Sequence, residues 1–78
     1  MKLKSMRDVK HFQHAIDRCS GAVWLHSKKD HYNVKSAMSQ YVAIGKLLSG
    51  DSELELFTES KEDEKYFLRM FAAYPEMV

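Results

Sequence analysis

The chain has 78 residues, 45% of them hydrophobic and 29% charged, with a formal net charge of +1 and one cysteine. This length fits a single domain, 1–78, with a modest core, and the composition excludes a disordered chain. One cysteine excludes an internal disulfide, and without a signal peptide or a long apolar run we expect a cytoplasmic protein with no membrane partner.

Charge is unevenly distributed along the chain. Residues 1–50 hold nine Lys/Arg and three Asp/Glu, whereas residues 51–78 hold three basic and eight acidic residues. A nucleic-acid-binding chain would instead combine a clear positive total with a basic stripe interleaved with aromatic residues. We therefore expect a protein partner and no nucleic-acid partner.

In chain order, residues 1–4 predict a brief edge strand, and the next segment predicts a helix. Ser5 followed by Asp8 is similar to a capping box. Apolar residues then recur at helical spacing, namely Val9, Phe12, Ala15 and Ile16. The opposite face is either simply solvated or docks an acidic partner, and its residues are Arg7, Lys10, His11, His14 and Arg18. No cysteine or carboxylate completes a ligand set with the two histidines, so we expect no metal site.

Three further segments alternate as strands and are joined by turns or helices, at 22–27, 31–34 and 53–56. Successive side chains of a strand point to opposite faces of a sheet, so alternate positions are divided between two faces. The inward set is Val23, Leu25, Leu54 and Leu56. Trp24 and Phe57 fall on the other side, so we expect them on an exposed sheet face.

Two more helices are expected. The first starts at Ser36, is weakened by Gly45, and has the expected core face Ala37, Met38, Tyr41, Ile44 and Leu48, widened by Val42 and Leu47. The last begins at a second capping-box-like pair, Ser60 and Asp63, and its apolar face is Phe67, Met70, Phe71 and Tyr74. Acidic residues near its start suit the positive end of a helix. Pro75 ends it, and we expect residues 76–78 to fray.

The element order strand, helix, strand, strand, helix, strand, helix predicts an α+β fold. One sheet can cover the apolar faces of three helices from one side. We expect an open-faced sandwich with a four-stranded antiparallel sheet, a shortened first strand and three helices on one face. The other face is bare, and the chain can form a homo-oligomer through Trp24 and Phe57.

Residues 33–41 join the second main strand to the following helix and form the strongest candidate for a regulated site. The Ser36 hydroxyl can accept from free backbone N–H groups at the helix start, as an N-cap does. The same helix end attracts a phosphate, and Lys35 lies alongside. Ser36 is therefore either a plain helix cap or a phosphorylation or anion site.

The residues Asn33-Val34-Lys35-Ser36-Ala37-Met38 are similar to the segment around the regulatory serine of the HPr family, the histidine-containing phosphocarriers of the bacterial sugar phosphotransferase system. The resemblance extends weakly over residues 5–74 and implies an open-faced sandwich of four strands and three helices. It also implies that an HPr kinase/phosphorylase modifies Ser36 and that the modified form docks on a transcriptional regulator, with Met38 in the apolar docking patch.

One departure from the family decides the expected function. Phosphocarriers carry a histidine, followed closely by arginine and proline, before the first helix, but Ser5 stands where that histidine would be. The resemblance therefore implies a non-catalytic regulatory or interaction module, not an enzyme and without a cofactor. Its expected partner-docking residues are Lys35, Met38, Arg7 and His11. The alternatives are a phosphocarrier that uses His11 or His14, and a structural adaptor that associates through the exposed sheet face.

Overall fold

The computed structural model describes residues 1–51 and 53–78. In this part of the chain, helices and strands follow in the order α1 (Met6–Arg18), β1 (Val23–His26), β2 (His31–Asn33), α2 (Ala37–Leu48), β3 (Glu55–Thr58) and α3 (Glu64–Ala73). Two short 3-10 turns precede and follow α3, namely η1 (Lys61–Asp63) and η2 (Pro75–Met77).

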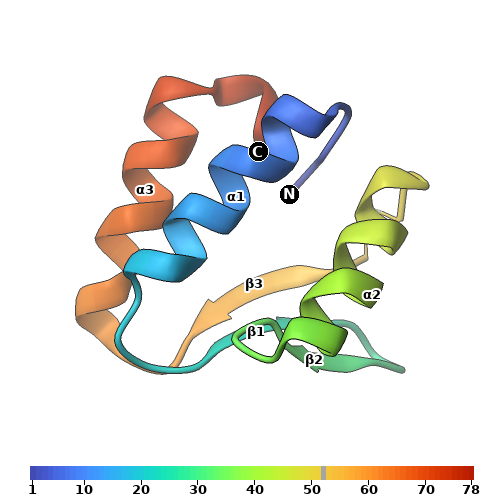
Figure 1. Cartoon of the computed structure of the whole chain (residues 1–78), viewed down its shortest axis with the longest axis horizontal. Helices are drawn as coiled ribbons and strands as arrows, with labels where there is room; N and C mark the ends of the chain where they lie inside the picture. The colour runs from blue at the N-terminus through green and yellow to red at the C-terminus, as the bar shows by residue number, and fades with distance from the viewer. Residues whose placement is uncertain (52) are drawn as a thin grey trace.

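The strands form one antiparallel sheet in the order β2-β1-β3. The three α-helices lie on the same side of this sheet, with α1 and α3 side by side and α2 next to β2 (Figure 1). The expected α+β class, with an open antiparallel sheet and three helices, is confirmed. The expected number of strands is wrong, since the described residues form three strands and not four.

Residues 1–4 form no strand because their backbone groups are bonded elsewhere. The Lys2 N–H donates to the Met77 carbonyl at 2.7 Å, and the Lys4 N–H donates to the Asp8 carboxylate at 2.9 Å. Leu3, between them, is buried in the core. The N-terminal segment therefore packs against the C-terminal turn and the start of α1, and it does not extend the sheet beside β3.

The C-terminal residues are ordered by the same contact, which corrects the expectation that they fray. Pro75 starts η2, where the missing N–H of proline costs nothing at the first position. Met77 is completely buried and belongs to the core. The two ends of the chain thus support each other through one backbone hydrogen bond and through the burial of Leu3 and Met77.

Helix α1 begins and packs as the sequence predicts. The Asp8 N–H donates to the Ser5 Oγ at 3.3 Å, which is one half of a capping box. The whole expected apolar stripe enters the core, and its members are Val9, Phe12, Ala15 and Ile16.

Helix α2 buries only part of the face expected from the sequence, namely Ile44 and Leu47. The residues that enter the core are Ala43, Ile44 and Leu47. Met38 and Tyr41 are 76% and 80% exposed. Both sides of this helix are apolar, so helical spacing alone does not select the buried side. The rotation of α2 agrees with a tertiary contact to α1, in which the Gln13 Nε2 donates to the Gln40 Oε1 at 3.1 Å.

Strand β3 begins at Glu55, later than the expected start at residue 53, but the expected orientation of its side chains is confirmed. Leu54 is buried, Leu56 packs against the core, and Phe57 is 55% exposed. Phe57 lies opposite Trp24 in the register of β1 and β3. The two aromatic residues therefore share the face of the sheet that is turned away from the helices (Figure 1).

Asp63 joins the end of α1 to the start of α3 and does not complete the expected capping box with Ser60. Ser60 makes no side-chain cap bond. The Asp63 carboxylate is buried and accepts from the Ser20 N–H at 3.1 Å, the Ser20 hydroxyl at 3.4 Å and the Gly21 N–H at 2.9 Å. The pKa of this carboxyl lies below its ordinary value, chiefly because the Gly21 N–H donates to the carboxylate. The bonds from Ser20 lower the pKa further, whereas burial acts in the opposite direction.

We expect alanine at two glycines to change stability in opposite directions. A Cβ at Gly21 would lie 3.3 Å from the Ser60 Cβ, so the turn would have to shift, whereas a Cβ at Gly45 would meet nothing within 4 Å. In a helix, alanine is about 0.5–1 kcal/mol more favourable than glycine. Urea unfolding should therefore show a higher midpoint for Gly45→Ala and a lower one for Gly21→Ala. A lower midpoint for Gly45→Ala would contradict the open surroundings of that position.

We expect Asp63→Asn to destabilise the fold in a pH-dependent way. Because the folded pKa of Asp63 lies below the unfolded one, its contribution is complete above the unfolded pKa and is lost as pH falls through the folded pKa. Thermal unfolding at pH 7 should show a Tm lower by about 5 °C or more for the variant. This gap should narrow below about pH 4. The exposed Asp17→Asn is the control, and a gap that stays constant down to pH 3 would contradict the assigned role.

Candidate functional site

The turn that carries Ser36 runs from the end of β2 to the start of α2. The Lys35 N–H donates to the Asn33 Oδ1 at 3.1 Å, and the Ser36 N–H donates to the Asn33 carbonyl at 3.0 Å. Such a local turn around asparagine is typical of strand ends. The Ser36 carbonyl then accepts from the Gln40 N–H at 2.8 Å, which starts the helical hydrogen-bond ladder. Ser36 therefore occupies the N-cap position, as the sequence predicts.

The Ser36 side chain does not act as a cap. Its residue is exposed, and its hydroxyl makes no side-chain cap hydrogen bond to the first turn of α2. The first turn of α2 also contains no acidic residue. The expectation that the Ser36 hydroxyl caps α2 is thus wrong. The hydroxyl lies at the positive end of the helix and is accessible from solvent.

Lys35 fastens this turn to α1. Its Nζ donates to the Cys19 carbonyl at 2.7 Å and to the Ile16 carbonyl at 3.2 Å. These carbonyls belong to the C-terminal end of α1, where a cation is favourable. The ammonium group that the sequence suggested for partner docking is therefore bound within the fold, and a docking role for Lys35 stays a prediction.

The outward side of α2 carries a row of exposed apolar side chains, which we call the α2 stripe, consisting of Met38, Tyr41, Val42 and Leu48. The stripe starts two positions after Ser36 and follows the helix at intervals that place its members on one side. Contiguous apolar residues on a surface typically mark an interaction site. Met38 belongs to this stripe, and its role in docking stays a prediction.

All four residues of the α2 stripe are surface residues that sequence reasoning assigned to the core. A signal that could have corrected this was the polar pair Gln40 and Gln13, since two glutamines on neighbouring helices can bond to each other. The Gln13 Nε2 donates to the Gln40 Oε1 at 3.1 Å. This contact turns Gln40 towards α1 and is consistent with Tyr41 and Val42 lying on the outside.

Arg7 and His11 are not brought together with Ser36. Gln13 is the residue of α1 that contacts α2 through Gln40. His11 lies about 200° away from Gln13 around the axis of α1, and Arg7 lies on the same side as His11. The His11 ring stacks on Tyr74 with 3.9 Å between ring centroids. The expected docking residues therefore form two groups on different sides of α1.

The exposed face of the sheet carries a row of rings. Trp24 is partly exposed and opposes the exposed Phe57 across β1 and β3. The His26 ring lies 6.5 Å from the Phe57 ring and 5.7 Å from the His31 ring, measured between centroids. This face offers an aromatic surface for association, and a homo-oligomer that uses it stays a prediction.

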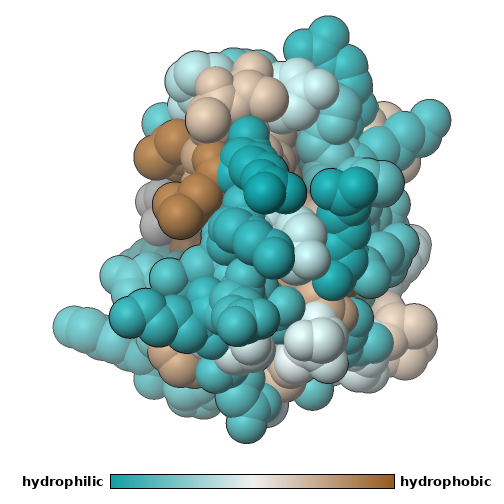
Figure 2. Space-filling model, turned by 90° about the vertical axis from the view of Figure 1, so that its left-hand side faces the viewer, coloured by the Kyte–Doolittle hydropathy of each residue, from teal (hydrophilic) through white to brown (hydrophobic). Residues whose placement is uncertain are grey.

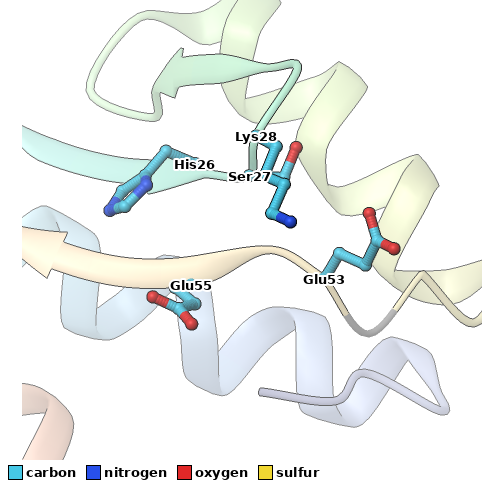
Figure 3. A pocket seen from close by; sticks show the side chains of 5 residues that line it. All are labelled: His26, Ser27, Lys28, Glu53 and Glu55. Atoms are coloured by element: carbon cyan, nitrogen blue, oxygen red, sulfur yellow. The ribbon is translucent and has the colours of Figure 1, made fainter.

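A shallow pocket of about 530 Å³ lies beside this face, between the β1–β2 turn and the start of β3 (Figure 3). It mixes a histidine, a serine, a lysine and two glutamates, which are His26, Ser27, Lys28, Glu53 and Glu55. In Figure 3 the side chains of His26 and Glu53 extend in opposite directions. Among the described residues no group of three His, Cys, Asp or Glu is arranged to hold a metal ion.

Cys19 is a structural residue. Its side chain is buried, and its Sγ lies 3.3 Å from the Ala15 carbonyl oxygen. Burial, together with the nearby Asp63, raises the pKa of the thiol against the opposing effect of Lys35. Because the thiolate is the reactive form of cysteine, this environment disfavours nucleophilic chemistry.

Comparisons with known proteins leave the site to be interpreted from its own chemistry. No family model matches the chain, and neither the curated proteins nor the solved structures include a significant match. Within residues 1–51 and 53–78, no helix has the length and apolar character needed to cross a membrane.

Proposed function

We propose that this chain is an HPr-like, non-catalytic regulatory or interaction module whose switch is phosphorylation of Ser36. The observation that carries the proposal is the exposed Ser36 hydroxyl, free of a cap bond, at the start of a helix whose outward side is the apolar α2 stripe. A modifiable group and a docking surface thus lie next to each other on one helix.

The helix end supports a phosphate on Ser36. Backbone N–H groups at a helix start favour negative charge by about 1 kcal/mol or less at an exposed position. The first turn of α2 adds no carboxylate that would repel it. Lys35 holds the turn against α1 through its ammonium group, so the added charge need not disturb the backbone around Ser36.

The α2 stripe provides the readout. A phosphate two positions before Met38 adds a strong anion at one end of an apolar surface, so a partner can combine a basic group with an apolar contact. An HPr kinase/phosphorylase or a transcriptional regulator is the kind of protein partner that the resemblance implies. The element order from α1 onward agrees with the order expected for that family, with the first strand missing.

The surroundings of the histidines favour this regulatory role over phosphate transfer. Ser5 caps α1, the place at which the family presents its histidine. His11 stacks its ring on Tyr74, and His14 lies further along the helix. Neither imidazole lies at the start of the helix, where backbone N–H groups would stabilise a transferred phosphoryl group.

Phosphosite mapping tests the proposal. We expect incubation with an HPr kinase and ATP to add one acid-stable phosphate, located on Ser36 by peptide mass spectrometry. Ser36→Ala should abolish it, and Ser39→Ala, on the same helix, should leave it unchanged. Incubation with phosphoenolpyruvate and the first enzyme of the phosphotransferase system should add no acid-labile phosphate. Acid-labile phosphate on His11 or His14 would contradict the proposal and favour a phosphocarrier.

The α2 stripe has its own test. We expect Met38→Ala to lower the kcat/KM of an HPr kinase for Ser36 by about fivefold, because a buried contact worth about 1 kcal/mol is lost on docking. Met38 is exposed, so the Tm should stay nearly unchanged. Met6→Ala, at an exposed methionine on α1, is the matched control. An equal loss for both variants would show that the stripe has no special role.

A further inference from the structure

A groove of about 220 Å³ runs between α1 and α3 and is lined by basic and aromatic residues from both helices. We call it the α1–α3 groove, and its polar members are His11, His14, Arg18, Tyr66, Arg69 and Tyr74. Small or apolar side chains, including Ala15 and Met70, complete the lining. The two helices lie side by side in Figure 1.

Aromatic rings accompany the basic groups along this groove. The His11 ring stacks on Tyr74 at one end, and the Arg18 guanidinium carbon lies 5.8 Å from the Tyr66 ring centroid at the other. Lys65 approaches the same Tyr66 ring at 5.2 Å. These contacts orient the cations without neutralising them, because a ring contributes a quadrupole and no net charge.

Within residues 1–51 and 53–78, these cations form no ion pair with a carboxylate. None of the described residues that line the groove is acidic. The ion pair found in the described part of the chain joins Lys46 to Asp30, at α2 and the β1–β2 turn. The chain contains 11 acidic residues, so carboxylates are available in the sequence, but they do not lie in the lining of the groove. Figure 2, seen from the α3 side, shows a surface that is hydrophilic over most of its area.

The dimensions of the groove favour a peptide. Its volume is below the range of roughly 300–1,000 Å³ in which small ligands are usually enclosed. On α1 the basic row begins before the groove, at Arg7, and continues to Arg18 over about 16 Å. A nucleic acid would require a larger positive total than a net charge of +1. An acidic segment can instead place carboxylates on the arginines and an apolar side chain against Ala73, which is exposed in the groove.

We propose that the α1–α3 groove binds an acidic peptide segment of a protein partner. This surface is separate from the α2 stripe, because Gln13, on the opposite side of α1 from His11, makes the contact to α2. The proposal therefore does not depend on Ser36. It gives the chain a second interaction surface of opposite chemical character to the first.

Fluorescence anisotropy with a labelled peptide of about 12 residues, in which glutamates and leucines recur at helical spacing, tests the proposal. We expect binding at low salt and an affinity at least tenfold weaker for the double variant Arg18→Glu/Arg69→Glu. The control Lys28→Glu/Lys29→Glu changes the net charge equally, from +1 to −3, at a turn outside the groove. It should retain the affinity within about twofold. A peptide with glutamine in place of glutamate should not bind.

Three outcomes would overturn the proposal. One is a failure of the acidic peptide to bind, and another is an equal loss in the groove variant and the turn variant, which would indicate nonspecific attraction. The third is tighter binding of a single-stranded oligonucleotide through Arg18 and Arg69. Circular dichroism checks that each variant is folded, and Arg18→Gln/Arg69→Gln replaces the charge reversal if it is not. Amide chemical shifts of the wild-type protein provide a further check, since the peptide should move Ala15 and Met70 and leave Tyr41 in place.

Discussion

The hydrogen bonds between the Asp63 carboxylate and the turn after α1 are the interaction on which the rest of the structure depends. One carboxylate oxygen accepts from the Ser20 N–H and the other from the Gly21 N–H, across 42 residues of sequence in the second case. Asp63 immediately precedes α3, and Gly21 leads into β1. A single buried carboxylate therefore determines where two helices and the central strand of the sheet meet. Gly21 also approaches Ser60 closely, since a Cβ added at Gly21 would lie 3.3 Å from the Ser60 Cβ.

The turn before α2 is joined to the same end of α1. Lys35 places its ammonium group on two carbonyls of the last turn of α1, where the helix dipole favours a cation. Anchoring by Asp63 and by Lys35 makes the C-terminal end of α1 the meeting point of the turns that lead into β1 and α2. Because the Lys35 ammonium group donates to carbonyls of α1, the turn that contains Ser36 is held in place by Lys35. The Ser36 hydroxyl is therefore not needed to stabilise this turn.

This arrangement leaves two surfaces of different chemistry on different sides of α1. The α2 stripe is apolar and begins next to Ser36, whereas the α1–α3 groove is basic and aromatic. Cys19 is buried, and the side chains of His26 and Glu53 extend in opposite directions. In the functions proposed above, both surfaces present side chains to other proteins. The sheet face with Trp24 and Phe57 is a third exposed surface.

The sequence by itself determined the extent and the buried face of α1 and the orientation of the strand side chains. In these segments the apolar residues fall on one side only, so only that side can be buried. It also placed Ser36 at the start of a helix. Only the tertiary structure decided the rotation of α2, since both sides of that helix are apolar and the bond between Gln40 and Gln13 joins it to α1, 27 residues away in sequence. The same holds for the N-terminal segment, whose Lys2 N–H pairs with Met77 at the other end of the chain. The partners of Asp63 and the α1–α3 groove likewise arise from residues distant in sequence, and local spacing carries no information about such contacts.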